Sequence, residues 1–396
     1  MGKMLSCSIC GGQDIASVFR TLAPMLHLVP AEAEDQLNVL PEIDIVGCSD
    51  CGHLFNRLFD PDLATHAYAR SPVTNVPVHP SMNTRLENLF AWLDGSNLRG
   101  SHILEIGAGS GQLARLFADV GACVTLFEPS LGLKADAFPE PNITLHSHEY
   151  TGLGARPSAD IVLCRQVLEH IEEPNLFVAM IAADTKPGGL VYLEVPNSGY
   201  ITDYAAVQDL HAQHVHYFMP ENVISLAACH GLEMVRTQFI KDQHDVGILF
   251  IRKNCDTPLV SKCSYDMGSL KCRLQERERA YHNAIAKQHG RLALYGATMQ
   301  GSVFFGLVEN DNQFTCVLDD NSMNYDFVLR GRAKNLLIMP PNKAVLADLD
   351  AIVITAYLHD TAIAERLRDM NFLGRIFTTR PAPLENNSFS MQSLLG

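Results

Sequence analysis

Three features of membrane, secreted and nucleic-acid-binding proteins are absent from this chain of 396 residues. No apolar run reaches the roughly 18 to 20 residues that a transmembrane helix needs. The N-terminal residues MGKMLSCSIC lack the apolar core and cleavage site of a secretory signal. Net positive charge is missing too, because 30 Lys and Arg stand against 44 Asp and Glu, a formal charge of −14. We therefore expect a cytoplasmic protein with reduced thiols, and neither nucleic acid nor a membrane as its main partner.

The overall composition is that of a globular protein. Charged residues make up 19% of the chain and hydrophobic residues 47%, unlike a disordered sequence. A chain of this length predicts two or three domains. No self-similarity within it is strong enough to indicate a repeat protein.

Spacing sets four of the eleven cysteines apart. Cys7 and Cys10 lie in CSIC, and Cys48 and Cys51 lie in CSDC, each pair followed directly by glycine. Two such turns can aim four thiolates at one tetrahedral zinc ion, and four protein ligands leave no position for water, so the zinc would be structural. Two unrelated pairs, or a redox dithiol, are the alternative. A redox pair, however, normally opens a helix in a βαβ context that is missing here.

A glycine-rich turn follows an apolar stretch in HILEIGAGSGQLARLF. We expect a strand over 103–106, a turn through Gly107, Gly109 and Gly111, and a helix from about Gln112. The glycines let the backbone turn sharply and approach a ligand, whose polar atoms would meet N–H groups at the start of the helix. Such a turn alone is a weak indication, so its neighbours decide the ligand.

Two acidic residues favour S-adenosylmethionine (SAM) over a dinucleotide as that ligand. Glu128 closes the next expected strand, ACVTLFEPS, where it can accept both ribose hydroxyls of an adenosine. Glu105 lies just before the turn, where it would repel a pyrophosphate but could hold the ammonium of a methionyl group. The glycine pattern is also G-x-G-x-G rather than G-x-G-x-x-G. We assign Gln166, in ADIVLCRQVLEHIEEP, to the cofactor site as well.

Later segments continue the alternation of a doubly wound sheet. ADIVLCRQVLEHIEEP is typical of a buried strand and then a helix, and PGGLVYLEVPN of a turn and the next strand. A connecting helix with solvated charges follows, and its buried face is expected to hold Leu270, Leu274, Tyr281 and Ile285. RLALYGATMQGSVFF then repeats the strand, turn and helix theme. Three further strands and a helix near 361–370 predict a second, smaller parallel sheet.

Together these segments resemble the sugar C-methyltransferases that act on nucleotide-linked deoxyketosugars. The resemblance is carried by ILEIGAGSGQL, VLEHIEEP, KPGGLVYLEVPN and the four-cysteine module. It implies an α/β protein in three parts: a zinc-binding module (1–75), a methyltransferase domain with a doubly wound Rossmann-like sheet (80–253) and a C-terminal half-Rossmann α/β domain (265–396). It also implies an enzyme that uses SAM and structural Zn²⁺ on a small-molecule substrate, and it leaves the oligomeric state open.

The stretch HAQHVHYF would supply catalytic residues in that family. The resemblance makes His214 the base, with Gln213 where the family has Glu and His211 where it has Tyr. A neutral imidazole can remove the acidic hydrogen beside a ketone, leaving an enolate that attacks the sulfonium methyl group. Gln213 could orient a ring without raising its basicity, and His211 could donate to the developing oxyanion. Tyr68, in THAYARS, resembles an aromatic hydroxyl that could do the same.

Other interpretations of these histidines stay open. His214 could instead be a packed, hydrogen-bonded histidine. His211 and His214 could also bind a metal, although no clear third ligand is visible in the sequence. His216 alternates with His214, so an extended chain would point it the opposite way, and we expect it to pack structurally.

Two departures from the resembled family bear on the substrate. Gln300 stands where that family often has a basic residue, and Asn324 takes a further basic position, so charges that would meet a diphosphate are missing. The hypothesis of a C-methyltransferase for a nucleotide-linked sugar therefore stands beside two others. One is an O- or N-methyltransferase for another small molecule, and the other is a non-catalytic relative that binds SAM without turnover.

Overall fold

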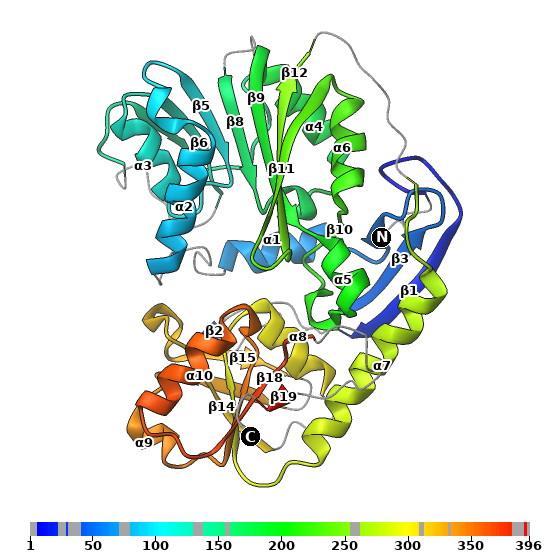
Figure 1. Ribbon diagram of the computed structural model, residues 1–396, viewed down its shortest axis with the longest axis vertical. Helices are drawn as coiled ribbons and strands as arrows, with labels where there is room; N and C mark the ends of the chain where they lie inside the picture. The colour runs from blue at the N-terminus through cyan, green and yellow to red at the C-terminus, as the bar shows by residue number, and fades with distance from the viewer. Residues whose placement is uncertain are drawn as a thin grey trace.

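The computed structural model arranges the strands of this chain in three sheets. Figure 1 shows the seven-stranded sheet in the upper half, the eight-stranded sheet below it and the small N-terminal sheet at the right. None of the described helices combines the length and apolar character that a membrane crossing needs. The structure describes residues 6–22, 29–30, 41–70, 80–129, 138–154, 159–253, 262–308, 313–331, 334–381 and 392–393.

The N-terminal sheet is built mainly from strands that follow or lead into the two Cys-x-x-Cys turns. It is antiparallel throughout, in the order β1-β3-β4-β10. Its strands are β1 (Ile15–Leu22), β3 (Glu42–Cys48), β4 (Leu54–Asn56) and β10 (His216–Tyr217). Helix α1 (Pro61–Arg70) follows β4. Because β10 belongs to the HAQHVHYF stretch, this sheet joins the cysteine module directly to the segment with the candidate catalytic histidines.

The seven-stranded sheet has the order β11-β12-β9-β8-β5-β6-β7. Strand β12 is antiparallel to its neighbours β9 and β11, and the other pairings are parallel. The strands are β5 (His102–Ile106), β6 (Cys123–Phe127), β7 (Ile143–His146), β8 (Ala159–Arg165), β9 (Thr185–Pro196), β11 (Leu232–Ile240) and β12 (Asp245–Arg252). The helices are α2 (Pro80–Trp92), η1 (Gly95–Asn97), α3 (Gln112–Asp119), η3 (Leu168–His170), α4 (Pro174–Asp184), α5 (Ser198–Tyr204), η4 (Val207–Asp209) and α6 (Pro220–Ala228).

Helices cover both faces of this sheet because side chains alternate along each strand. Ile103 and Leu163 pack on one face with residues of α2 and α3. Leu104 and Val162, their neighbours along the same strands, pack on the other face with residues of α4 and α6. The doubly wound, Rossmann-like α/β fold expected from the sequence is thereby confirmed.

The eight-stranded sheet has the order β19-β18-β17-β13-β14-β16-β15-β2, with a parallel centre and antiparallel edges. Its strands are β2 (Val29–Pro30), β13 (Leu292–Tyr295), β14 (Phe314–Leu318), β15 (Phe327–Arg330), β16 (Asn335–Met339), β17 (Ala351–Ile354), β18 (Arg375–Thr378) and β19 (Gln392–Ser393). Its helices are α8 (Met299–Leu307), η6 (Ser322–Asn324), α9 (Lys343–Leu346), η7 (Tyr357–His359) and α10 (Asp360–Asp369). The sequence predicted four of these strands and missed β2, β15, β16 and β19.

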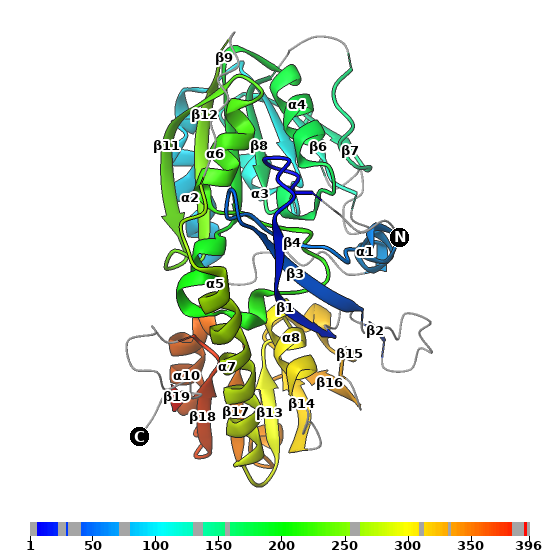
Figure 2. The ribbon, with the colours of Figure 1, turned by 90° about the vertical axis from the view of Figure 1, so that its right-hand side faces the viewer.

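Helix α7 (Met267–Ala286) runs along the side of the molecule beside β1 (Figure 2). The four apolar residues expected on one face are all buried: Leu270, Leu274, Tyr281 and Ile285. The expectation that its charges are solvated was wrong for Arg277, which is 1% exposed and donates to the Tyr204 carbonyl oxygen at 2.8 Å. The Arg277 guanidinium can be buried because it donates a hydrogen bond to this backbone carbonyl oxygen.

One continuous core joins the N-terminal sheet and the eight-stranded sheet with helices α5 and α7. It contains Ile45 of β3, Tyr200 of α5, Leu274 of α7 and Leu294 of β13. Strand β2 pairs with β15, and β10 pairs with β4, so each crosses one of the predicted domain limits. The limits themselves stay a prediction.

Candidate functional site

The glycine turn lies at the carboxyl end of β5, which lies between β8 and β6 in the seven-stranded sheet. Gly107, Gly109 and Gly111 have φ values of 75°, 57° and 70°, the left-handed region that glycine enters without strain. A Cβ at Gly107 would lie 2.3 Å from a Val167 methyl carbon, and one at Gly111 would lie 2.3 Å from the Phe138 ring. Glycine is therefore needed at both ends of the turn. Helix α3 starts directly afterwards, with Gly111 as its N-cap.

Glu105 is buried beside this turn with part of its carboxylate unpaired. The residue is 3% exposed, and its Oε2 has no hydrogen-bond partner. Burial raises the pKa of Glu105 to about 7, against the opposing effect of Arg165 and with a smaller contribution from Glu128. Because a buried carboxylate oxygen without a partner is costly, a cationic ligand group suits this position.

Glu128 and Gln166 follow the two strands that flank β5. Glu128 Oε2 accepts a 2.8 Å hydrogen bond from the Gly109 N–H, so this carboxylate lies against the glycine turn. Gln166 has a φ of 54°, and its side-chain amide lies 3.2 Å from Asp245 Oδ2. The structure thus brings Glu105, the glycines and Glu128 together, whereas the Gln166 side chain faces Asp245.

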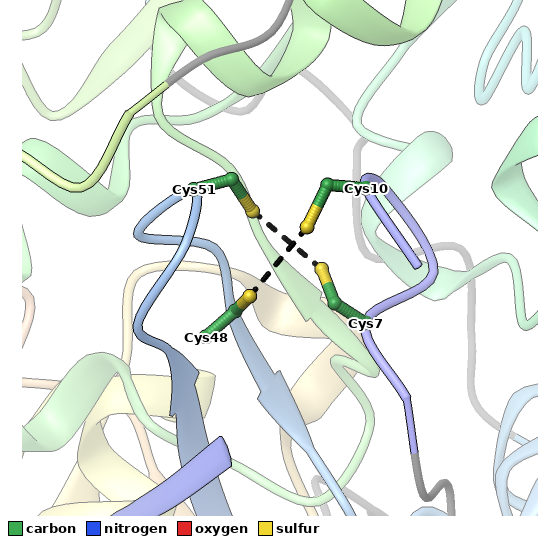
Figure 3. Close-up of side chains that lie close together, drawn as sticks. All are labelled: Cys7, Cys10, Cys48 and Cys51. Carbon is green, nitrogen blue, oxygen red and sulfur yellow. Dashed lines mark hydrogen bonds between the residues drawn. The ribbon is translucent and has the colours of Figure 1, made fainter. Parts of the chain in front are cut away.

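Four cysteine sulfurs converge in the N-terminal module (Figure 3). Cys7 Sγ lies 3.6 Å from Cys51 Sγ, Cys10 Sγ lies 3.6 Å from Cys48 Sγ, and all four lie within 4.8 Å of one another. A tetrahedral zinc ion with Zn–S bonds of about 2.3 Å separates its sulfurs by about 3.8 Å, whereas a disulfide needs about 2.05 Å. The donor atoms and their spacing therefore fit a single zinc ion.

Both cysteine pairs use the same backbone turn. Gly11 and Gly52, the glycines that follow the pairs, have φ values of 74° and 73°. Each donates its N–H to the carbonyl oxygen of the first cysteine of its pair, Cys7 or Cys48, at 2.8 Å. This left-handed turn is what folds two thiols toward one point, and it explains the glycine after each Cys-x-x-Cys motif.

Three histidines and a glutamate meet near the carboxyl ends of β8 and β9. The His214 ring centroid lies 3.8 Å from that of His211 and 4.7 Å from that of His170. Glu169 has a carboxylate oxygen within 4.8 Å of ring nitrogens of His170 and His214. A backbone hydrogen bond of 3.0 Å from Val215 N–H to the Glu169 carbonyl oxygen joins the two segments. We call Glu169, His170, His211 and His214 the histidine cluster.

Burial keeps the imidazoles of the histidine cluster uncharged. It lowers the pKa of His211 to about 3 and that of His170 to about 4. Burial, with smaller contributions from neighbouring imidazoles, also holds the pKa of His214 well below its usual range. Burial raises the pKa of Glu169 to about 8. An uncharged imidazole can accept a proton or bind a metal ion, although the lowered pKa makes it a weaker base.

The other predicted residues near this stretch take different places. Gln213 is buried, and its carbonyl oxygen accepts a 2.8 Å hydrogen bond from His170 Nδ1. His216 Nδ1 lies 3.0 Å from His53 Nε2, which agrees with its expected packing role. Tyr68 belongs to α1, but its side chain lies outside the described residues.

Sequence reasoning missed Glu169 and His170 as neighbours of His214. Both lie in LEHIEEP, where we expected a helix directly after the strand. The structure has the short turn η3 there, and α4 begins only at Pro174. An acidic residue followed by histidine at a strand end was the signal available, since side chains at such ends face the ligand-binding edge of an open α/β sheet.

A polar network connects this region to the eight-stranded sheet. Asp209 of η4 accepts hydrogen bonds from Tyr357 Oη at 2.6 Å and from the Gln300 side-chain amide at 3.3 Å. His244 lies 3.5 Å from Asp209 and 2.6 Å from Asp245. Although burial opposes the change, these two carboxylates raise the pKa of His244 to about 9. Gln300 thus pairs with a protein carboxylate at this contact.

The eight-stranded sheet has a glycine turn of its own, after β13. Gly296 has a φ of 113°, and the Ala297 N–H donates to Asp319 Oδ2 at 2.7 Å. This arrangement parallels Gly109 and Glu128 in the first turn. Asn324 is buried with its amide 3.5 Å from Asp319 Oδ1. The second turn therefore combines an acidic residue with backbone donors.

The sheet order, the glycine turn and the acidic residues beside it have the arrangement of a Rossmann-like methyltransferase fold. Comparison with known proteins agrees: the family described as "Methyltransferase domain" matches residues 79–237. A ubiquinone biosynthesis O-methyltransferase of Bordetella avium is 33% identical over 133 residues, which cover 31% of this chain and 52% of that protein. The enzyme of the same name from Paraburkholderia phymatum is 32% identical over 129 residues, 31% of this chain and 54% of that protein. The chain spans about half the length of the curated relatives it matches.

Solved structures of methyltransferases are similar to part of this chain. The magnesium protoporphyrin IX methyltransferase of Synechocystis PCC 6803 is 20% identical, with a TM-score of 0.36, and covers 43% of this chain and 82% of its own. The 1,6-didemethyltoxoflavin-N1-methyltransferase of Burkholderia thailandensis is 19% identical, with a TM-score of 0.39, and covers 52% of this chain and 97% of its own.

Proposed function

We propose that this protein is an active SAM-dependent methyltransferase for a small molecule. The observation that supports this most directly is the unpaired, buried Glu105 oxygen beside the glycine turn, which suits the ammonium of a methionyl group. Glu128 would hold the ribose, and the N–H groups of the turn would donate to polar cofactor atoms. Gln166 would contact the cofactor from the end of the neighbouring strand. Bound SAM supplies an electrophilic methyl group.

We further propose a nucleotide-linked deoxyketosugar as the substrate and carbon as the methylated atom. The three-part resemblance to sugar C-methyltransferases supports this choice. So does the uncharged His214, which is only partly buried and lies among other imidazoles at the ligand-binding edge of the sheet. His214 would remove the proton beside the ketone, His211 or Tyr68 would stabilise the enolate oxygen, and Gln213 would support the loop.

The four cysteines are proposed to hold a structural zinc ion. Cys7, Cys10, Cys48 and Cys51 fill a tetrahedral shell, so this zinc would contribute to folding rather than to catalysis. Through the β4–β10 pairing, the zinc module would keep the histidine stretch in register.

A second candidate function is O-methylation of another small molecule. The curated relatives are named O-methyltransferases and match the methyltransferase part of this chain. The missing basic side chains at Gln300 and Asn324 also fit a substrate without a diphosphate. The cofactor site would be the same in both cases.

The experiment incubates the full-length protein with SAM carrying a ¹³C-labelled methyl group and a panel of nucleotide-linked 4-ketosugars and phenols. NMR of the product shows whether the methyl group sits on carbon, oxygen or nitrogen. A C-methyl product, with deuterium uptake beside the ketone in D₂O, supports the first proposal. A methyl group on a heteroatom supports the second candidate and contradicts the first. SAM binding by calorimetry with no methylation of any acceptor would favour a non-catalytic relative.

We expect His214→Ala to abolish turnover while SAM affinity stays within about twofold, since the base and the cofactor site are separate groups. Turnover and calorimetric affinity are measured on the same preparation. His289→Gln, at an exposed loop position far from the site in the chain, is the control. Equal loss of turnover and SAM affinity in His214→Ala would show a folding role instead.

A further inference from the structure

We propose that Glu169, His170 and His214 form a second metal site in this chain, one that binds a divalent transition-metal ion such as Zn²⁺. The site is separate from the four cysteines and differs from them in its ligands, which are imidazole nitrogen and carboxylate oxygen. Such ligands suit Zn²⁺, Co²⁺, Ni²⁺ or Fe²⁺ rather than Ca²⁺ or Mg²⁺.

The ligand atoms are already gathered. One carboxylate oxygen of Glu169 and one ring nitrogen each of His170 and His214 all lie within 4.8 Å of one another. Ligands bound at about 2.0 to 2.2 Å from one ion lie about 3 to 4 Å apart. Closing the group around an ion therefore takes shifts of the ligand atoms of about 1 Å. Within the described residues, this is the one such group besides the four cysteines.

His170 is oriented as a metal ligand normally is. Its Nδ1 lies 2.8 Å from the Gln213 carbonyl oxygen, which can only accept, so Nδ1 carries the proton. The lone pair is then on Nε2, which lies 4.0 Å from Glu169 Oε1 and so faces the proposed site. A metal-binding histidine typically donates its other ring N–H to a backbone carbonyl in this way, which fixes the tautomer and the ring plane.

A buried Glu169 oxygen without a partner is evidence for a ligand that does not depend on the spacing of the ligand atoms. The residue is 1% exposed, yet its Oε2 has no hydrogen-bond partner. In His211, which packs against His214, Nδ1 is also without a partner. A purely structural histidine cluster would be expected to satisfy these atoms, because a buried polar atom without a partner costs about 1 to 3 kcal/mol. A cation would pair the carboxylate, and the His211 ring would lie beside it, 3.8 Å from the His214 ring.

The proposed metal site also lies close to the glycine turn after β5. It is formed by η3, directly after β8, and by the loop before β10, and Val167 of the same segment packs over Gly107. His214 is partly exposed, so an ion could enter from solvent. The positive charge of His244 acts on His214, but Asp209 and Asp245 lie beside it and offset that charge.

A metal ion here would compete with the role proposed above for His214. A ring nitrogen that binds a metal cannot accept a substrate proton at the same time. We therefore infer that Zn²⁺ inhibits methyl transfer by occupying the base; this consequence rests on the proposed function, whereas the binding itself does not.

The test measures metal stoichiometry in the full-length protein. Wild-type protein, with its cysteine site filled by Zn²⁺, is dialysed against micromolar Co²⁺, and metals are counted by mass spectrometry. We expect about one Co²⁺ per chain, with visible absorption bands but no strong near-ultraviolet thiolate band. Glu169→Gln, which keeps the side-chain size, and His170→Asn should each weaken Co²⁺ binding at least tenfold, whereas His289→Gln should not.

Several results would overturn the proposal. They are the absence of bound Co²⁺ in wild type, a thiolate band showing that Co²⁺ enters the cysteine site instead, and equal binding in Glu169→Gln and wild type. Circular dichroism and SAM affinity show whether each variant is folded, and if His170→Asn is not, Glu169→Gln still decides. A second ion in a protein that transfers no methyl group even after that ion has been removed would leave the site standing and remove the proposed function. Methyl transfer without a second ion would do the reverse.

Discussion

At the residue scale, two of the buried polar atoms without a hydrogen-bond partner are carboxylate oxygens that lie where ligands are proposed. Glu105 Oε2 lies beside the glycine turn, and Glu169 Oε2 lies in the histidine cluster. Folded proteins pair nearly all such atoms, because each unpaired one lowers the free energy of unfolding. We interpret both carboxylates as groups whose partner is a ligand rather than another part of the chain.

Glu105→Gln should make the protein without cofactor more stable but weaken SAM binding. The pKa of Glu105 is raised from 4.5 to about 7 in the folded state. Between pH 4.5 and pH 7, the folded protein therefore keeps a proton on Glu105 that the unfolded protein has lost. Stability contributed by this proton is present below pH 4.5 and is lost as the pH rises to 7. At pH 8 the variant should gain about 1 to 3 kcal/mol in free energy of unfolding.

Urea unfolding at pH 5 and pH 8 checks the gain, which should be small at pH 5. Affinity for S-adenosylhomocysteine should fall about tenfold, because its ammonium loses a charged partner. Glu87→Gln, an exposed change on α2, should alter neither quantity. Unchanged affinity in Glu105→Gln would contradict the assignment of Glu105 to the ammonium.

At the element scale, one carbon added to the glycine turn would clash with the packed protein. Gly111→Ala places a Cβ in the left-handed region and 2.3 Å from the Phe138 ring, at the start of α3. Gly188→Ala is the matched control, because Gly188 has a φ of 77° but nothing within 4 Å of its added Cβ. We expect about 1 to 2 kcal/mol of destabilisation in the control, and a larger loss together with loss of SAM binding in Gly111→Ala. Thermal unfolding and calorimetry measure the two effects, and similar values for both variants would refute the steric argument.

The pairing of β4 with β10 links the zinc module to the histidine stretch. Phe55 pairs with His216, and Leu54 pairs with Tyr217. If the four cysteines hold the proposed zinc ion, Cys48→Ser should release it, lower the unfolding temperature and reduce methyl transfer, because the register of the stretch depends on this sheet. Cys272→Ser, an exposed change on α7, is the control. Zinc content by mass spectrometry, alongside activity, checks the prediction; retained activity without zinc would show that the two elements are independent.

At the scale of the whole molecule, the contact between the two large sheets should depend on pH. His244 lies between Asp209 and Asp245, and against the rings of Tyr200 and Tyr357. The pKa of His244 is raised from 6.5 to about 9 in the folded state. The charged imidazole therefore stabilises the fold fully below pH 6.5, and this stabilisation is lost as the pH rises to 9. The free energy of unfolding should fall by about 1 to 3 kcal/mol over this range, and His244→Gln should flatten that dependence. Urea titrations at pH 6 and pH 9.5 measure it; the same slope in the variant would assign the effect to other groups.

Local sequence patterns were sufficient to predict several elements of this molecule. The strand, glycine turn and helix of the proposed cofactor site follow one another without interruption from His102 to Asp119. Each Cys-x-x-Cys-Gly turn closes on itself through the hydrogen bond from Gly11 or Gly52. The buried face of α7 follows from helical spacing alone. Such features are encoded at short range, where residue type and periodicity determine backbone conformation.

The sequence by itself therefore determined the fold class, the glycine turn after β5 and the two Cys-x-x-Cys-Gly turns. Only the tertiary structure decided which distant residues meet: Glu169 and His170 with His214, β2 with β15, and the burial of Arg277 against Tyr204. The physical reason is that these contacts depend on how sheets and loops pack across many intervening residues. No spacing along the chain records that packing, because a side chain at a loop or strand edge has several possible neighbours until the core fixes its position.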